Sequence, residues 1–185
     1  IPWDDDIDIG FLRKDYDRFL ALAKEELSDK YEVLNAIEDQ NYPLPTTRLV
    51  KKGTVFHEEP LKNCKCNFGI FLDLYSFDNA ADDEKAMRKQ GKKAWFWGKL
   101  LILRHIGKPT LYFGGWKAAL VRAACQVAHF FLWLFRISPR WLYEKAMKAS
   151  RRYENEETKR VAWFFDPMPF TSIIEKEQLL PTKKM

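Results

Sequence analysis

The chain has 185 residues, of which 46% are hydrophobic and 15% aromatic, so it can form one domain with a sizeable core. Its net charge of +5 suits an anionic partner, such as a nucleotide, a phosphorylated substrate or an acidic membrane face, and does not choose among them. The three cysteines, Cys64, Cys66 and Cys125, exclude a disulfide framework and lack the spacing of a zinc site, so we expect free thiols in a reducing compartment.

The first half of the chain alternates between strand and helix signals. Polar and apolar residues alternate over residues 6–12, which predicts a strand. Residues 13–27 carry apolar side chains at helical spacing and predict an amphipathic helix. The elements predicted next are a strand at 31–37, a turn at 41–45, a hairpin at 47–56 around Lys52 and Gly53, and a very apolar strand at 68–75.

The second half is mainly helical. Helices are predicted at 82–106, with acids in the first turn, and at 116–135. Ser138 and Pro139 form a cap and first residue for a third helix that ends near residue 153. Residues 158–165 predict a returning strand, and Ser172 a cap for a short final helix. The chain thus predicts a single α+β domain over 1–185, a mixed sheet with flanking helices and a helical insertion at about 82–155.

Aspartates crowd the beginning of the chain, which reads IPWDDDIDIG. Residues two apart in a strand face the same way, so Asp6 and Asp8 project together while Ile7 and Ile9 point into the core. Adjacent carboxylates repel each other and are costly to bury unless they are paired or bind a metal. Mg²⁺ prefers oxygen ligands and takes one or two carboxylates from a protein.

Asp73 is a lone acid inside the apolar run IFLDLY. If its strand lies beside the first one, Asp73 completes a cluster with Asp6 and Asp8. Such a cluster can hold two metal ions that clamp the attacking and leaving oxygens of a phosphoryl transfer. The alternative is structural: Asp4 and Asp5 form a solvated turn, and Asp73 caps the end of a strand.

Three segments occur in a recognisable order. They read IPWDDDIDIG followed by RKDY at residues 1–16, GIFLDLYSFDN at residues 69–79, and LPTKK at residues 180–184. Together they resemble the LicD family of phosphotransferases, relatives of fukutin and the fukutin-related protein. The resemblance runs along nearly the whole chain, and its first segment is the most specific.

This resemblance implies a nucleotidyltransferase-like fold. It also implies transfer of a phospho-alcohol, typically phosphocholine, from a CDP-linked donor to a hydroxyl of a surface glycan such as teichoic acid or lipopolysaccharide, including lipid-linked glycans. By that carry-over, Asp6, Asp8 and Asp73 match the catalytic carboxylates that bind Mg²⁺ or Mn²⁺. Arg13 and Arg48 match basic positions that meet the donor phosphates, with a surface strand residue as the alternative for Arg48.

The chain starts at Ile1, directly inside the first motif, and ends just after the third. We therefore expect a fragment that is truncated at both ends. In the family, a glycine-bearing strand and turn normally precede the first motif and help to hold the donor phosphates. Their absence implies that the isolated fragment can be inactive even if its parent is an enzyme.

The predicted helix at 116–135 has the length of a membrane span. Arg122 and His129 lie inside it, and a charged residue at the bilayer centre is costly, so spanning is disfavoured. A core helix is the leading interpretation, and an interfacial helix is the alternative because Trp and Phe residues lie among flanking Lys and Arg. We accordingly expect a cytoplasmic protein, with peripheral contact to the inner face of the membrane as the alternative.

Two other classes of function compete with a metal-dependent phosphotransferase. One is a non-catalytic membrane- or glycan-associated module with a degenerate nucleotidyltransferase fold. The other is a nucleotidyltransferase that acts on nucleic acid. Its only support is the aromatic and basic run KKAWFW at residues 92–97, which could stack on bases. Helix packing explains that run equally well, so we expect no nucleic-acid partner.

Overall fold

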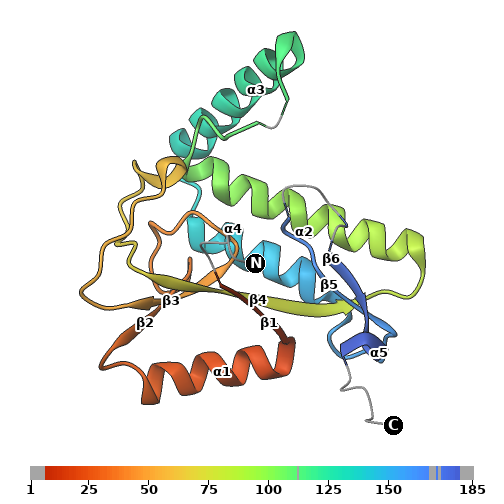
Figure 1. Ribbon diagram of the computed structural model, residues 1–185. Coiled ribbons are helices and arrows are strands. Elements are labelled where there is room, and N and C mark those ends of the chain that lie inside the picture. Colours follow the sequence, from red (N-terminus) through yellow and green to blue (C-terminus); the bar gives the residue numbers. More distant parts are fainter. Residues whose placement is uncertain (1–6, 112, 167–169, 171, 180–185) are drawn as a thin grey trace.

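The computed structural model describes residues 7–111, 113–166, 170 and 172–179, and within them the chain forms a six-stranded mixed sheet with flanking helices (Figure 1). The strands run in the order β2-β3-β4-β5-β6, and β1 pairs with β4 outside this path. Their bounds are β1 Asp8–Leu12, β2 Tyr31–Leu34, β3 Thr47–Lys51, β4 Phe71–Ala80, β5 Arg160–Trp163 and β6 Ser172–Glu175. The α+β class predicted from the sequence is confirmed.

The long strand β4 organises the sheet. Its first half pairs with β1 in parallel and with β3 in antiparallel orientation. Its last residues pair with β5, which returns to the sheet after the helical insertion. Because β4 pairs with β1, it brings Asp8 of the first motif and the strand of the residue 69–79 motif into one layer.

The helices end and begin close to where their capping residues predict. They are α1 Arg13–Glu26, α2 Glu84–His105, α3 Gly115–Leu134, α4 Pro139–Ser150 and the short α5 Lys176–Leu179, with 3₁₀ turns η1 Glu59–Leu61 and η2 Arg151–Tyr153. The Asp83 carboxylate accepts a hydrogen bond from the Ala86 N–H, and the Ser138 hydroxyl oxygen accepts one from the Trp141 N–H. Each bond satisfies one of the N–H groups that a helix start leaves unpaired.

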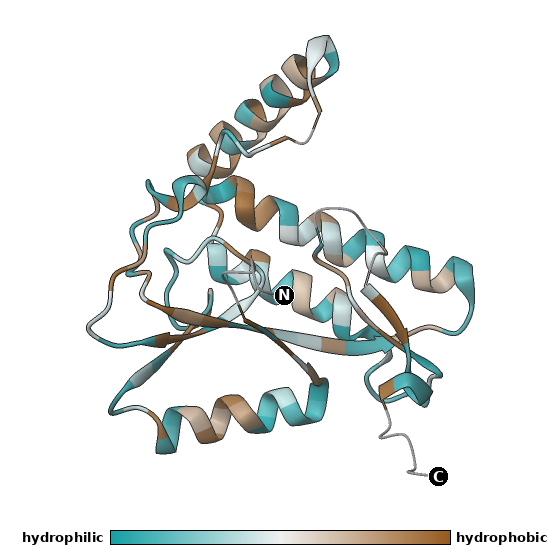
Figure 2. Cartoon of the chain, viewed as in Figure 1, coloured by the Kyte–Doolittle hydropathy of each residue, from teal (hydrophilic) through white to brown (hydrophobic). Residues whose placement is uncertain are grey.

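Apolar residues hold these layers together. In the view of Figure 1, α1 lies below the strands and α2 lies above them. Tyr16 and Ala23 of α1 pack against Leu49 and Leu74, and Figure 2 shows β1 and the first half of β4 as an apolar layer. A second cluster joins α2, α4, β4 and β5; its buried members include Met87, Ala94, Ala146, Ala149, Ala162 and Trp163. The burial of these side chains is the main force that stabilises the arrangement.

Three local predictions are wrong. The hairpin expected at 47–56 does not form: β3 ends at Lys51, the chain turns at Gly53 with a φ of 75°, and β3 pairs with β2 and β4 instead. The strand expected at 31–37 ends at Leu34, because the Asn35 side chain accepts hydrogen bonds from the N–H groups of residues 37 and 38. Ser172 begins strand β6 rather than capping a helix.

The helix α3 projects away from the rest of the chain (Figure 1). Only Ala118 of α3 is fully buried, so the leading interpretation of residues 116–135 as a core helix is wrong. No single helix of the described residues has both the length and the apolar character needed to cross a membrane. Taken together, Gly115–Leu134 and Pro139–Tyr153 would meet that requirement, but the two segments are bent by 116° relative to each other.

Candidate active site

Asp8 and Asp73 lie directly beside each other on neighbouring strands. They are Cα partners in the parallel pair of β1 and β4, and the N–H of Asp73 donates to the carbonyl of Ile7 at 3.2 Å. Adjacent strands lie about 4.8 Å apart and paired residues point to the same face, so the two carboxylates share one side of the sheet. The sequence-based expectation that Asp73 lies beside the first strand is confirmed. Ile7, expected in the core, is 62% exposed, whereas Ile9 packs into the α1 cluster.

Arg48 extends this row of charges onto a third strand. It is the Cα partner of Asp73 on β3, and its Nε donates to Oδ1 of Asp73 at 3.0 Å. Its other two guanidinium nitrogens donate to the two carboxylate oxygens of Glu58. The guanidinium also lies 3.6 Å from the centroid of the Phe71 ring, in cation–π geometry. Arg48 is buried and is therefore held in place from three sides.

The charges around Asp73 affect its protonation in opposite directions. Burial raises the pKa of the Asp73 carboxyl, Arg48 opposes that shift, and the nearby carboxylate of Asp8 adds to it. Burial is the largest of these effects, and it disfavours the ionised form of Asp73. The charge of Arg48 is divided between two carboxylates, because Arg48 pairs with both Asp73 and Glu58. A cation bound at Asp8 and Asp73 would favour the ionised form of both carboxyls.

The donor set fits a hard divalent cation. Asp8 and Asp73 offer carboxylate oxygens from one face, and Mg²⁺ commonly binds through one or two carboxylates and leaves its remaining positions to water and substrate phosphates. Mn²⁺ accepts the same ligands. The predicted third ligand, Asp6, lies outside the described residues, and among the described residues no group of three His, Cys, Asp or Glu is placed to hold a metal.

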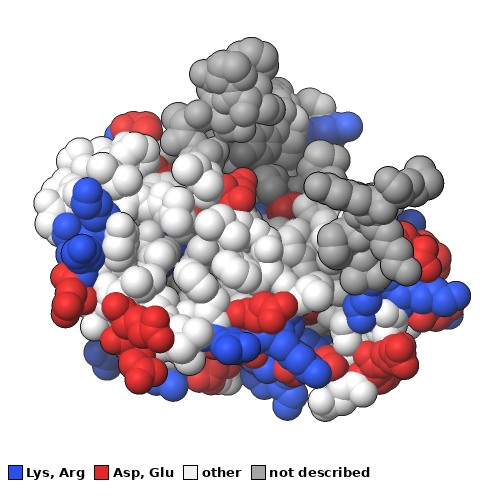
Figure 3. All heavy atoms as spheres, turned by 60° about the horizontal axis from the view of Figure 1, so that its bottom comes forward, with Lys and Arg blue, Asp and Glu red and all other residues white. Residues whose placement is uncertain are grey.

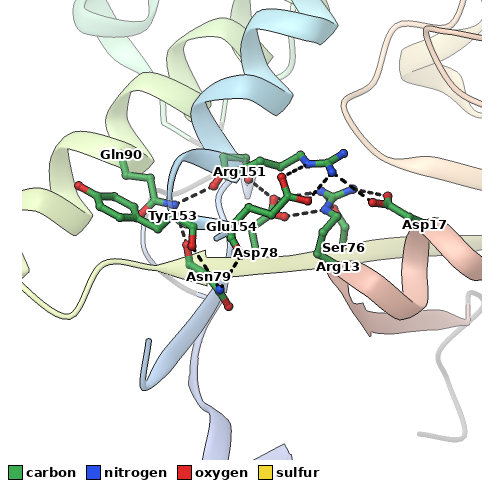
Figure 4. A network of polar contacts seen from close by, with 10 residues as sticks. Arg13, Asp17, Ser76, Asp78, Asn79, Gln90, Arg151, Tyr153 and Glu154 are labelled. Carbon is green, nitrogen blue, oxygen red and sulfur yellow. Dashed lines mark hydrogen bonds and ion pairs between the residues drawn. The ribbon is translucent and has the colours of Figure 1, made fainter. Parts of the chain in front are cut away.

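Arg13 is not part of this row. Its Nε donates to Oδ1 of Asp78 at 2.6 Å, and its Nη2 donates to Oδ2 of Asp78 at 3.0 Å and to the Ser76 hydroxyl at 2.6 Å (Figure 4). Side chains alternate along a strand, so Asp78 leaves β4 on the opposite face from Asp73. The structure therefore places Arg13 in a buried ion pair that joins α1 to β4, away from the Asp8 and Asp73 carboxylates.

The Arg13 contacts belong to a larger network that fastens the helices to β4. The Ser150 hydroxyl at the end of α4 donates to Asp78, and Arg151 pairs with Asp17 of α1 at 3.3 Å (Figure 4). Burial alone would lower the pKa of Arg13, but the hydrogen bond and the charge of Asp78 outweigh it and raise that pKa. Arg13 thus stays charged and acts as a structural connection between elements far apart in sequence.

Sequence reasoning assigned no role to three residues that shape these contacts. Asp78 carried a signal, since it is a second acid in the strand that contains Asp73. Phe71 looked like an ordinary core residue, although its ring supports the Arg48 guanidinium. Glu58 gave no signal, because it lies outside any strand and reaches Arg48 only through the path of the loop between β3 and β4.

These features define an α+β domain with two carboxylates and an arginine in a row across three neighbouring strands, β1, β4 and β3. The family model of the LicD/FKTN/FKRP nucleotidyltransferase domain matches residues 1–92, about half of the chain. The chain is therefore a member of the LicD family, a family of transferases. The matched residues include the whole row and the Arg13–Asp78 pair. No curated protein and no solved structure matches the chain.

Proposed function

We propose that this protein transfers a phospho-alcohol from a CDP-linked donor to a hydroxyl of a cell-surface glycan, with divalent metal bound at Asp8 and Asp73. Phosphocholine from CDP-choline is the first candidate for the transferred group, and teichoic acid, lipopolysaccharide or a lipid-linked glycan for the acceptor. The single observation that carries the proposal is the register of Asp8 opposite Asp73, with Arg48 beside them, inside the region that matches the family.

The reaction exchanges the phosphoanhydride bond of the donor diphosphate for a phosphate ester bond to the acceptor. The acceptor hydroxyl oxygen bonds to the phosphorus that carries the alcohol, the bond from that phosphorus to the bridging oxygen breaks, and CMP leaves with that oxygen. The acceptor proton goes to a base. Protein catalysis of such a transfer consists mainly of positioning and of stabilising the charge that develops on the phosphate oxygens.

The residues of the row have distinct roles in this proposal. Asp8 and Asp73, with Asp6, hold Mg²⁺ or Mn²⁺, which supplies positive charge to the donor diphosphate when bound. Arg48 fixes the orientation of the Asp73 carboxylate through Nε, while Glu58 fixes Arg48. Asp8 is the more exposed of the two carboxylates and is thus the better placed to meet the acceptor and take up its proton.

The pairing of Asp8 with Asp73 favours a catalytic protein over the non-catalytic alternative. A glycan- or membrane-associated module with a degenerate site needs no pair of like charges on neighbouring strands, which is costly to maintain. Retention of this pair beside a buried arginine is explained by a cation that both carboxylates share. The three cysteines are free, which supports a reducing compartment, and we propose a cytoplasmic location on that basis.

The test is CMP release from CDP-choline, CDP-ribitol and CDP-glycerol, measured with Mg²⁺ or Mn²⁺ and a panel of surface glycans as acceptors. We expect metal-dependent CMP release that requires an acceptor and is reduced at least ~100-fold by Asp73→Asn, as is typical for loss of a group that positions metal and substrate. Asp29→Asn, a change at an exposed position in the turn between α1 and β2, is the matched control. A rate of CMP release that changes neither on removal of metal nor in Asp73→Asn would contradict the proposal.

A further inference from the structure

Charge is strongly segregated along this chain. Residues 85–143 contain twelve Lys and Arg and no Asp or Glu. The rest of the chain therefore carries more acidic than basic residues, although the whole is basic. By contrast, the face turned forward in Figure 3 carries acidic and basic side chains side by side. Helices α2 and α3 thus carry most of a segment that is basic and free of acids.

An apolar stripe lies on the exposed side of α3. Its members recur at helical spacing and point to one side of the helix. They are Trp116, Leu120, Val127, Phe130, Phe131 and Leu134, each about half exposed or more, with Trp116 at 74%. The helix that carries them projects from the body (Figure 2). Monomeric proteins rarely expose so continuous an apolar surface unless something covers it.

The opposite side of α3 accounts for its attachment to the body. Ala118 is fully buried there, and the His129 ring Nδ1 lies 2.6 Å from the Leu103 carbonyl of α2, to which it donates a hydrogen bond. The imidazole also fills the space over Gly107, where a Cβ would come within 2.9 Å of it. The exposed stripe therefore lies on the face of α3 that is turned away from α2.

We propose that α3 docks this stripe into the surface of a membrane that contains anionic lipids. Interfacial helices bury an apolar face among the lipid chains while Lys and Arg meet the headgroups, and Trp residues favour that boundary. Here Lys117 and Arg122 flank the stripe, Arg136 and Arg140 follow it, and Trp116 and Trp133 lie near its two ends. The absence of acids from residues 85–143 is the charge pattern that an anionic surface selects.

Charge argues against the two competing occupants. A second copy of the chain docked stripe against stripe would bring two acid-free basic regions together, and like charges oppose that contact. A nucleic acid would use the basic residues, but its phosphates and bases gain nothing from exposed Leu120, Val127 and Leu134. A lipid surface uses both features. This proposal does not rest on the phosphotransferase activity.

The experiment is flotation of the chain with unilamellar vesicles of phosphatidylcholine, alone or mixed with phosphatidylserine. We expect binding to the mixed vesicles, at least ~10-fold weaker binding to phosphatidylcholine alone, and weakening by salt. The variant Trp116→Gln, Leu120→Gln, Phe131→Gln is expected to lose binding. The matched control replaces three exposed apolar residues elsewhere, as Leu22→Gln, Val55→Gln and Leu179→Gln, and keeps it. Circular dichroism checks that both variants fold.

A second experiment tests the role of charge with two double variants. One combines Lys117→Glu with Arg122→Glu on α3, and the control combines Lys14→Glu with Arg18→Glu on the exposed side of α1. We expect only the first pair to weaken binding to phosphatidylserine vesicles. Asp8→Asn is expected to bind vesicles like the wild type, which separates this test from the fate of the proposed activity. The proposal is overturned if the wild type does not bind the mixed vesicles or if the stripe variant binds them as tightly as the wild type. It is also overturned if the wild type is a dimer and the only effect of the stripe variant is to make it monomeric.

Discussion

The guanidinium of Arg13 and the carboxylate of Asp78 form a buried ion pair at 2.6 Å that connects the first turn of α1 to the second half of β4. Their side chains are 9% and 1% exposed. Arg13 directly follows β1, so the pair also fixes the end of the strand that carries Asp8. The ion pair on one face of β4 thus supports the position of the aspartates on the other.

Removing one partner of this pair should destabilise the fold strongly. We expect Asp78→Asn to lower the free energy of unfolding by about 3–5 kcal/mol, because it removes the buried carboxylate that compensates the Arg13 charge and leaves only the more exposed Asp17 as an acidic partner. Urea unfolding monitored by circular dichroism measures the loss. The double variant Arg13→Leu, Asp78→Leu should recover part of it, because an apolar pair leaves no buried charge.

The control is Glu144→Gln, which breaks the exposed Arg140–Glu144 pair on α4. Exposed pairs contribute less than about 1 kcal/mol, so this variant should unfold almost like the wild type. Equal losses for Asp78→Asn and Glu144→Gln would show that the Arg13–Asp78 pair does not connect the elements as described.

Arg48 should be irreplaceable even by lysine. A lysine carries one compact charge on a flexible stem and cannot reproduce the rigid fork in which three guanidinium nitrogens donate to Asp73 and Glu58. Since Arg48 opposes the upward shift in the pKa of Asp73, its loss should raise that pKa further. We expect Arg48→Lys to move metal-dependent donor binding to higher pH. Arg18→Lys on α1 is the control, and identical pH profiles for the two variants would refute this role.

Gly10 is required by the close approach of β1 to the Phe77 ring. A Cβ at Gly10 would lie 2.6 Å from Cε2 of Phe77, well inside contact distance. We expect Gly10→Ala to lower the free energy of unfolding by about 1–3 kcal/mol, with partial rescue by Phe77→Leu. Gly114→Ala, where a Cβ meets nothing within 4 Å, should change it by less than about 0.5 kcal/mol. Thermal unfolding of the three variants shows whether the Phe77 ring excludes a side chain at residue 10.

His105 should make the fold sensitive to mild acid. Burial lowers the pKa of His105 to about 4, the neighbouring Arg104 adds to the shift, and Nε2 is buried without a hydrogen-bond partner among the described residues. The unfolded chain therefore binds more protons than the folded chain between pH 6.5 and about 4, so stability is lost as pH falls through that range. We expect a loss of about 1–2 kcal/mol, allowing for partial exposure.

The measurement is the difference between unfolding free energies at pH 7 and pH 4. His105→Gln should show a smaller difference than the wild type, since it cannot take up the proton. His57→Gln, at an exposed loop position, should behave like the wild type. A steeper pH dependence in His105→Gln would mean that the histidine is not held neutral in the fold.

The position of Asp73 could be predicted from the sequence because an acid in a very apolar strand has few satisfactory environments, and a neighbouring strand with its own acids is one. The roles of Arg13 and Arg48 could not. Both are arginines next to a motif, and only the pairing of β4 with β1 and β3 decides that Arg48 meets Asp73 while Arg13 meets Asp78. These contacts join residues 25 and 65 positions apart, a distance that local patterns do not encode.

The wrong hairpin has the same cause. Gly53 does turn the chain, with a φ of 75°, as the local signal indicates. But a turn does not determine which strand pairs with β3. Both edges of β3 are paired, one with β2 and the other with β4, and apolar residues of all three strands share one cluster. The helices were predicted well because caps such as Asp83 and Ser138 act within one turn of their own position.

The central claim, that Asp8 and Asp73 together hold a metal and its donor, is tested most directly by calorimetric titration of CDP-choline into the chain, with Mg²⁺ and with EDTA. We predict binding that requires Mg²⁺, that Asp29→Asn retains, and that Asp8→Asn weakens at least ~10-fold. The fold of Asp8→Asn should stay intact, since Asp8 is exposed and its charge disfavours the ionised form of Asp73. Binding of equal strength in Asp8→Asn, or binding unchanged by EDTA, would contradict it.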